Sequence, residues 1–385
     1  MSQASPPQIP VLILAGFLGS GKTTLLNHLL HRGGGSRIGA IVNDFGAIEI
    51  DAMAVAGALG DSTVSLGNGC LCCAVDASEL DLYLDRLARP AARIDVIVIE
   101  ASGLAEPQEL VKMLLASENP HIVYGGLVEV VDAAEFDATR EKHPEIDRHL
   151  AIADLVVVNK ADRAADPDRV IRLVRTLADG AAVVPASYGR IDPEFLFDCR
   201  PTEERIGQLS FDDLHRHEDS DHEDSDHEDS DHGGPHEPRG HLHSAYESVS
   251  FTSEVPLGPR RLMAFLDGRP DGLYRIKGYV DLGAADPRNR YAVHAVGRFL
   301  RFYPEPWPSG ERLTQLVLIG SGIDAVALRK ELEACKDDAP HADERGMWGV
   351  LRYVQEQEQE QEQEQEQEQE QEQEQEQEQE QEAEG

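Results

Sequence analysis

Glycines, a lysine and two threonines cluster near the N-terminus in the order Gly-Phe-Leu-Gly-Ser-Gly-Lys-Thr-Thr. In this pattern the glycine-rich backbone can aim N–H groups at a phosphate, the lysine can reach the β- and γ-phosphates, and the first threonine can ligate Mg²⁺. The spacing predicts a phosphate-binding (Walker A) loop; a glycine-rich turn without a nucleotide is the alternative. The residues expected to contact the nucleotide are Gly16, Gly19, Ser20, Gly21, Lys22, Thr23 and Thr24.

A second polar motif, Asn159-Lys160-Ala161-Asp162, follows an aliphatic run. A carboxylate at the last position can accept hydrogen bonds from both N1–H and N2–H₂ of guanine, a donor pair that adenine lacks. A buried Asp162 would therefore face unmatched acceptors with ATP. The motif favours GTP, with Asn159, Lys160 and Asp162 in the nucleotide site. The alternative is that Asp162 only caps a helix.

Glu100 ends another aliphatic run, at 95–99. A carboxylate at the C-terminal end of a buried parallel strand lies where a Walker B acid faces Mg²⁺ and its waters. Lys22, Thr23 and Glu100 are therefore the predicted catalytic residues, and Ser102-Gly103 occupies the position of a switch that senses the γ-phosphate. The alternative is that Glu100 caps the next helix. No glutamine that would orient the attacking water is identifiable, so we expect slow intrinsic turnover.

Three cysteines, Cys70, Cys72 and Cys73, lie within four positions of the chain. Thiolates are the soft ligands expected for Zn²⁺ or another thiophilic ion, and three of them leave a fourth position for a carboxylate, an imidazole or water. Such an incomplete site could exchange its ion. A buried structural cluster, or a strained disulfide between neighbours, is the alternative.

Four histidines, His217, His222, His227 and His232, recur every five residues among aspartates and glutamates. A period of five lines up on neither a helix face nor a strand face, and apolar residues are missing, so we expect a flexible segment. Imidazoles and carboxylates together suit weak, multiple binding of divalent ions, which makes these histidines accessory metal ligands. The alternative is a solvated linker.

The chain has 385 residues and a formal net charge of −37, concentrated in the histidine-rich segment and in the Gln-Glu repeat that follows residue 354. No basic stripe could track a phosphate backbone, which argues against a nucleic-acid partner. Apolar runs are too short to span a membrane, and residues 1–10 lack the apolar core of a signal peptide. With an odd number of cysteines, 5, these features predict a reducing, cytoplasmic location.

Short aliphatic runs alternate with helix-like segments through the first half of the chain. This alternation predicts an α/β domain, a P-loop NTPase sheet that is mostly parallel and has helices on both faces. The loops after parallel strands meet at one edge of such a sheet, where they can position the motifs above. The expected strands are 11–15, 37–43, 62–66, 94–100, 124–131, 154–159 and 181–185, and the expected helices are 22–32, 76–89, 106–117 and 166–178.

From residue 246 the pattern changes to that of a small α+β domain. Its expected strands are 248–251, 273–282, 291–302 and 313–319, and its expected helices are 258–268 and 323–335. The chain is thus expected to comprise a disordered start at 1–8, a P-loop domain at 9–200, a flexible His/Asp/Glu-rich linker at 201–245, the α+β domain at 246–354 and a low-complexity tail at 355–385.

The motifs and their order resemble those of the CobW-type P-loop GTPases, a metallochaperone family that includes the zinc-chaperone GTPases. The family usually has Asn-Glu-Phe-Gly where this chain has Asn-Asp-Phe-Gly, so the acidic position here is Asp44. The matching segments are 16–24, 43–46, 69–73, 100–103, 159–162 and, in the second domain, 275–278.

The resemblance implies a GTP-hydrolysing metallochaperone that delivers Zn²⁺ to a client metalloprotein, with Mg²⁺ beside the nucleotide and metal affinity coupled to nucleotide state. It also implies that the Asp44 carboxylate joins Cys70, Cys72 and Cys73 at the metal. Some relatives serve cobalt in cobalamin synthesis or iron in nitrile hydratase activation, so Co²⁺ and Fe²⁺ are alternative ions. A metal-buffering protein and a P-loop small-molecule kinase are the other functions left open.

Overall fold

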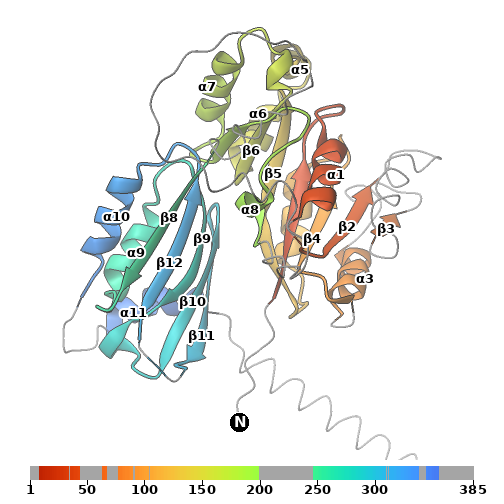
Figure 1. Cartoon of the computed structure of the whole chain (residues 1–385). Helices are drawn as coiled ribbons and strands as arrows, with labels where there is room; N and C mark the ends of the chain where they lie inside the picture. The colour runs from red at the N-terminus through yellow and green to blue at the C-terminus, as the bar shows by residue number, and fades with distance from the viewer. Residues whose placement is uncertain are drawn as a thin grey trace, which may run out of the picture. The chain divides into compact units, whose positions relative to one another are not determined.

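The chain divides into two compact units in the computed structural model (Figure 1). The first unit takes its residues from Met1–Glu247, Pro270–Tyr274 and Ile319–Ile323, and the second takes the remainder. The structure describes residues 8–33, 35–43, 63–66, 77–89, 92–103, 105–198, 246–308, 310, 312–337 and 344–354. The linker at 201–245 and the tail at 355–385, both singled out in the sequence, lie outside these ranges.

The first unit contains a seven-stranded sheet in the order β3-β2-β4-β1-β5-β6-β7, and its neighbouring strands run parallel. This confirms the expected α/β class with a parallel sheet. The strands are β1 (Ile9–Ala15), β2 (Ile38–Asn43), β3 (Thr63–Leu66), β4 (Val96–Glu100), β5 (Ile122–Asp132), β6 (Leu155–Asn159) and β7 (Ala182–Pro185).

Helices connect these strands and shield them from water. Every residue of β4 and β6 is buried, as expected for parallel strands covered on both faces. No helix among the described residues is long and apolar enough to cross a membrane. The helical segments are α1 (Lys22–Arg32), α3 (Ala77–Ala88), α4 (Pro107–Leu115), α5 (Phe136–Lys142), α6 (Ile146–Ile152), the short 3-10 helix η3 (Ala161–Arg163), α7 (Pro167–Leu177) and α8 (Pro193–Leu196).

The C-terminal ends of the central strands gather the polar residues of the motifs. Leu14, near the end of β1, pairs with Glu100 at the end of β4, and Asp132 at the end of β5 pairs with Asn159 at the end of β6. Because the strands are parallel, these ends share one edge of the sheet. The phosphate-binding loop therefore starts beside Glu100, two strands away from Asn159.

The second unit is built on a five-stranded sheet in the order β11-β10-β9-β12-β8, in which β10 runs antiparallel to both β9 and β11. Together with its helices this sheet confirms the expected α+β domain. The elements are β8 (Glu247–Ser253), α9 (Pro259–Asp267), β9 (Leu273–Val280), the 3-10 helix η5 (Gly283–Ala285), β10 (Asn289–Val296), β11 (Phe299–Pro306), β12 (Thr314–Gly320), α10 (Ala325–Ala334) and α11 (Glu344–Leu351).

One strand expected in this unit, 291–302, is instead a hairpin. Val296 pairs with Phe299, so the chain reverses across Gly297 and Arg298. Gly297 has φ 51°, a left-handed conformation that glycine adopts without the steric cost of a Cβ atom. The glycine therefore ends β10 and starts a second strand.

Candidate nucleotide-binding site

The phosphate-binding loop occupies the turn between β1 and α1. Gly16 and Gly21 have φ values of 140° and 106°, which residues with a Cβ atom rarely adopt. A Cβ atom on Gly16 would lie 2.2 Å from the carbonyl oxygen of Val130, and one on Gly21 would lie 2.2 Å from Nδ2 of Asn159. Glycine is thus required here both by the backbone conformation and by the close approach of β5 and β6.

Lys22, the first residue of α1, is buried and its ammonium group lies against the loop. Its Nζ donates to the carbonyl oxygen of Gly16 at 2.9 Å and to that of Phe17 at 3.4 Å. The charge is therefore held within the loop that the sequence predicts to bind phosphates.

Thr23 and Glu100 lie far apart in the sequence but meet in the structure. The Thr23 hydroxyl donates to Oε1 of the buried Glu100 carboxylate at 2.6 Å. Glu100 thus faces the phosphate-binding loop, whereas the N-cap position of the next helix, α4, is held by Glu106. A hydroxyl and a carboxylate are hard oxygen ligands of the kind that Mg²⁺ takes, so this pair fits the predicted magnesium ion.

Asn159 and Lys160 tie the second motif to the phosphate-binding loop. The Asn159 side chain donates from Nδ2 to the carbonyl oxygen of Ser20 at 2.9 Å, and its Oδ1 accepts from the Gly189 N–H at 2.9 Å. Lys160 donates from Nζ to the carbonyl oxygen of Gly19 at 2.7 Å and to Asp132 at 2.6 Å. These hydrogen bonds hold the motif at 159–162 against the phosphate-binding loop.

Asp162 lies within η3 and is exposed. It does not cap the next helix: the N-cap of α7 is Asp166, whose side chain accepts from the Arg169 N–H at 2.9 Å. Helix capping, the alternative to base recognition, therefore does not account for the Asp162 carboxylate.

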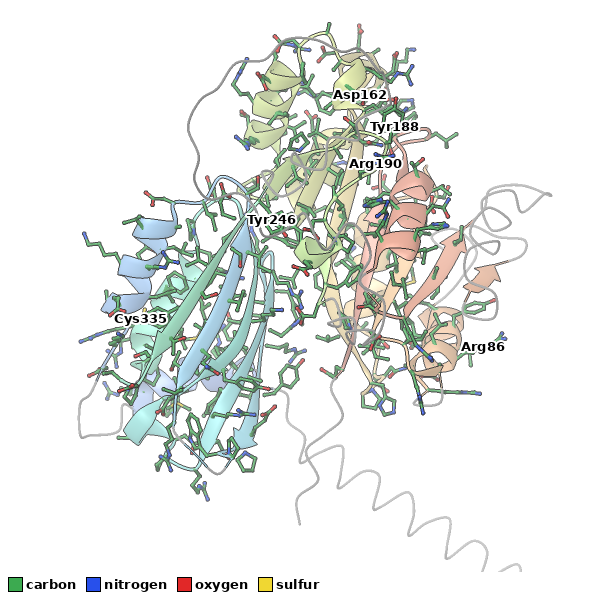
Figure 2. The ribbon with its side chains drawn as sticks, viewed as in Figure 1. Arg86, Asp162, Tyr188, Arg190, Tyr246 and Cys335 are labelled. Atoms are coloured by element: carbon green, nitrogen blue, oxygen red, sulfur yellow. The ribbon has the colours of Figure 1, made fainter. Side chains whose placement is uncertain are left out.

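A cavity of about 510 Å³ joins these groups. Ser20 instead lines a neighbouring cavity of about 260 Å³, and Gly16 is found in neither lining. The larger cavity also includes Arg163 and Tyr188, which the motifs did not indicate; Figure 2 labels Tyr188 and Asp162. Its lining residues are Leu18, Gly19, Gly21, Lys22, Thr23, Thr24, Glu100, Ala101, Ser102, Gly103, Asn159, Lys160, Asp162, Arg163 and Tyr188.

Sequence reasoning also missed Glu129, a carboxylate in the middle of β5 that lines the smaller cavity. Its side chain is 1% exposed, and its Oε2 has no hydrogen-bond partner among the described residues. Burial raises the pKa of Glu129 from 4.5 to about 8, while the positive charge of Lys22 opposes that rise. The signal in the sequence was a single acidic residue inside the otherwise apolar run at 127–131.

The predicted metal ligands Cys70, Cys72, Cys73 and Asp44 lie outside the described residues, as do the accessory ligands His217, His222, His227 and His232. Within the described part of the chain, no group of three or more histidines, cysteines and acidic residues could hold a metal ion. Cys335, which is described, is buried, and burial raises the pKa of its thiol to about 11, as suits a packing residue.

Two family models match the chain. The model of the CobW/HypB/UreG nucleotide-binding domain matches residues 10–185, and the model of the cobalamin synthesis protein CobW C-terminal domain matches residues 246–336.

Similar proteins cover most of the chain. A zinc chaperone CobW from Pseudomonas aeruginosa is 33% identical over 84% of this chain and 91% of its own length. A zinc chaperone CobW from a Sinorhizobium species is 28% identical over 86% of this chain and 99% of its own length. Zinc-regulated GTPase metalloprotein activator 1 of Saccharomyces cerevisiae is 26% identical over 85% of this chain and 84% of its own length.

Proposed function

The chain belongs to the CobW family of P-loop GTPases, and we propose that it uses GTP hydrolysis to deliver Zn²⁺ to a client metalloprotein. One observation supports the nucleotide half of this proposal above all: the phosphate-side and base-side motifs line a single cavity. Zinc as the cargo is supported by the names of the similar proteins and by the close spacing of Cys70, Cys72 and Cys73 in the sequence.

On the phosphate side, Lys22 would bind the β- and γ-phosphates, and the Thr23 hydroxyl and the Glu100 carboxylate would hold Mg²⁺. Bound Mg²⁺ supplies positive charge that offsets the charge developing on the transferred phosphoryl group. The 2.6 Å hydrogen bond between Thr23 and Glu100 supports this assignment because it shows that the two side chains reach the same point.

On the base side, Asp162 accepts from the N1–H and N2–H₂ groups of guanine. Asn159 acts indirectly, since its side chain joins the Ser20 carbonyl group to the Gly189 N–H. This bridge fixes the distance between the phosphate loop and the loop after β7.

For the cargo we propose Cys70, Cys72, Cys73 and Asp44 as ligands. The described strand ends support this choice. Asn43, which directly precedes Asp44, pairs with Leu66, and Val42 pairs with Glu100. The segments that carry the proposed ligands therefore leave the sheet from adjacent strand ends, next to the strand that carries Glu100. A change at the γ-phosphate and Mg²⁺ could in this way alter the metal ligands.

We further propose that His217, His222, His227 and His232 bind additional divalent ions weakly, and that the protein works in the cytoplasm. The proposed thiolate ligands support the cytoplasmic location, because a reducing compartment keeps cysteines free to bind metal. The imidazoles interspersed with carboxylates support the weak binding of additional divalent ions.

The proposed function is tested with full-length protein purified without chelator. We expect elemental analysis to find tightly bound zinc. We also expect the protein to release phosphate from GTP without any cosubstrate, whereas a small-molecule kinase would need a phosphoryl acceptor. Lys22→Ala should abolish phosphate release and keep the zinc, whereas Cys72→Ser should do the reverse. Phosphate release that depends on an added phosphoryl acceptor would contradict the GTPase assignment, and zinc content unaffected by Cys72→Ser would contradict the cargo site.

A further inference from the structure

Tyr188 lies in the loop after β7 and differs from the other aromatic residues that the structure describes in the first unit. Its side chain is 69% exposed, and its backbone has φ 57°. Aromatic residues rarely adopt this left-handed conformation, and such strain persists only where the surroundings impose it. A strained backbone that presents a large ring to solvent needs an explanation beyond packing.

The loop after β7 is held in place by the motif at 159–162 and by α1. The Gly189 N–H donates to Oδ1 of Asn159 at 2.9 Å, and the Ala161 N–H donates to the carbonyl oxygen of Ala186 at 3.1 Å. A Cβ atom on Gly189 would lie 2.7 Å from the backbone nitrogen of Leu25 in α1, so the loop packs closely against that helix. The backbone is thus held in place both before and after Tyr188.

Tyr188 lines the cavity of about 510 Å³ together with Asp162 and Lys160. Figure 2 labels Tyr188 and Asp162. Within the described residues, neither a hydrogen bond of its hydroxyl nor a contact of its ring with another aromatic ring or a cation is present. The Lys160 ammonium is already bound to the carbonyl oxygen of Gly19 and to Asp132. Tyr188 therefore contributes an unshared aromatic face to the base end of the cavity.

We infer that Tyr188 is a base-binding residue whose ring stacks on the face of the purine. This inference rests on the proposed binding of a guanine nucleotide and adds a separate contact to it. Asp162 reads the edge of the base, where guanine and adenine differ, whereas stacking uses the π-face that every base has. Tyr188 should therefore contribute to affinity without contributing to the choice between bases.

The test measures the affinity of the full-length protein for GDP and for inosine diphosphate, which lacks the 2-amino group of guanine. Tyr188→Ala should weaken both nucleotides by the same factor, about tenfold or more, while Tyr188→Phe keeps both affinities. The KM for GTP should rise in Tyr188→Ala and kcat should stay within about twofold, because a contact with the base is made equally in the bound substrate and in the transition state. Trp348→Ala, which removes an equally exposed aromatic side chain from α11, is the matched control and should change neither.

Tyr188→Gly separates binding from folding. Glycine relieves the left-handed strain, so the nucleotide-free protein should unfold at no lower temperature than the wild type while its GDP affinity falls as in Tyr188→Ala. Unchanged GDP affinity in Tyr188→Ala would overturn the inference, as would a loss confined to GDP and absent for inosine diphosphate. A wild-type protein that does not bind GDP, or one indifferent to Asp162→Ala, would instead overturn the proposed guanine site itself.

Discussion

Asp162 is the residue that selects the base in this account. We predict that the protein hydrolyses GTP with a kcat/KM at least about tenfold above that for ATP, because only guanine offers two donors to the carboxylate. Asp162→Asn should shift the preference toward xanthosine triphosphate, whose 2-oxo group accepts from the new amide. Steady-state phosphate release with the three nucleotides measures both effects.

The structure supplies a control for this prediction. Asp166 is the nearby acid that caps α7. Asp166→Asn keeps a capping side chain and should leave the nucleotide preference unchanged. Equal use of GTP and ATP by the wild type would show that Asp162 does not contact the base.

Glu129 is the second residue with a measurable signature. Its pKa is raised from 4.5 to about 8 in the folded state by burial. Between these two values the unfolded chain has released the proton that the folded protein still holds. Stability from this group is therefore fully present below pH 4.5, falls as the pH rises, and levels off above about pH 8. The fall amounts to at most about 1.4 kcal/mol per pH unit.

Glu129→Gln removes this titration while keeping the shape of the side chain. We predict that the free energy of unfolding of the variant gains on that of the wild type as the pH rises from 5 toward 8, and that the difference becomes constant above that range. Urea unfolding of both nucleotide-free proteins across this range gives the measurement. Parallel curves would mean that Glu129 is already ionised in the folded protein at pH 5. A constant offset caused by the new amide does not affect the readout.

At the scale of elements, the strands and the phosphate loop were predictable because their signals are local. Parallel strands buried on both faces read as unbroken aliphatic runs, and the loop between β1 and α1 carries its own glycines. The short helices α5 and α6 and the hairpin of β10 and β11 were not predicted. In the hairpin, the one turn signal, Gly297, is embedded in an apolar segment that reads as a single strand.

The proximity of Glu129 to Lys22 could not be predicted, because it depends on the register of β5 against β1. The register shifts between Val11 and Leu12, where Tyr124 and Gly126 are the partners, and this places Glu129 opposite Ala15 at the start of the phosphate loop. Gly125, which the shift skips, has no room for a side chain: a Cβ atom there would lie 2.9 Å from the carbonyl oxygen of Val11. The local sequence pattern does not predict how β5 pairs in register with β1.

We propose that the histidine-rich segment acts independently of the nucleotide site and of the tight metal site. Deleting residues 215–243 should lower the number of weakly bound Zn²⁺ or Ni²⁺ ions while sparing one tight site and the GTPase activity, because neither proposed site uses these residues. Equilibrium dialysis and phosphate release test the two halves.

Deletion of residues 355–385 is the matched control, since it removes acidic residues without removing a histidine. A metal count that falls equally in both deletions would assign the weak binding to negative charge alone. A count that falls in neither would reduce the histidine-rich segment to a connection between the units. Loss of GTPase activity on deleting residues 215–243 would show that the segment takes part in the nucleotide site.

At the scale of the whole molecule, the account depends on coupling between the nucleotide and the metal. Both proposed sites are reached from the same edge of the parallel sheet, through β4 to Glu100 and through β2 and β3 to the segments with Asp44 and the cysteines. Two sites coupled in this way must affect each other equally, because coupling free energies are reciprocal. A metal buffer with an incidental GTPase activity would show no such relation.

The affinity of the tight site for Zn²⁺ in each nucleotide state tests this claim most directly. Titration of the full-length protein against a chromophoric chelator, with a non-hydrolysable GTP analogue and then with GDP, should give affinities that differ by about fivefold or more, or about 1 kcal/mol. Cys72→Ser should remove the tight site and leave nucleotide binding intact. Equal affinities for Zn²⁺ in the two nucleotide states would contradict the account and leave a GTPase and a metal site that act independently.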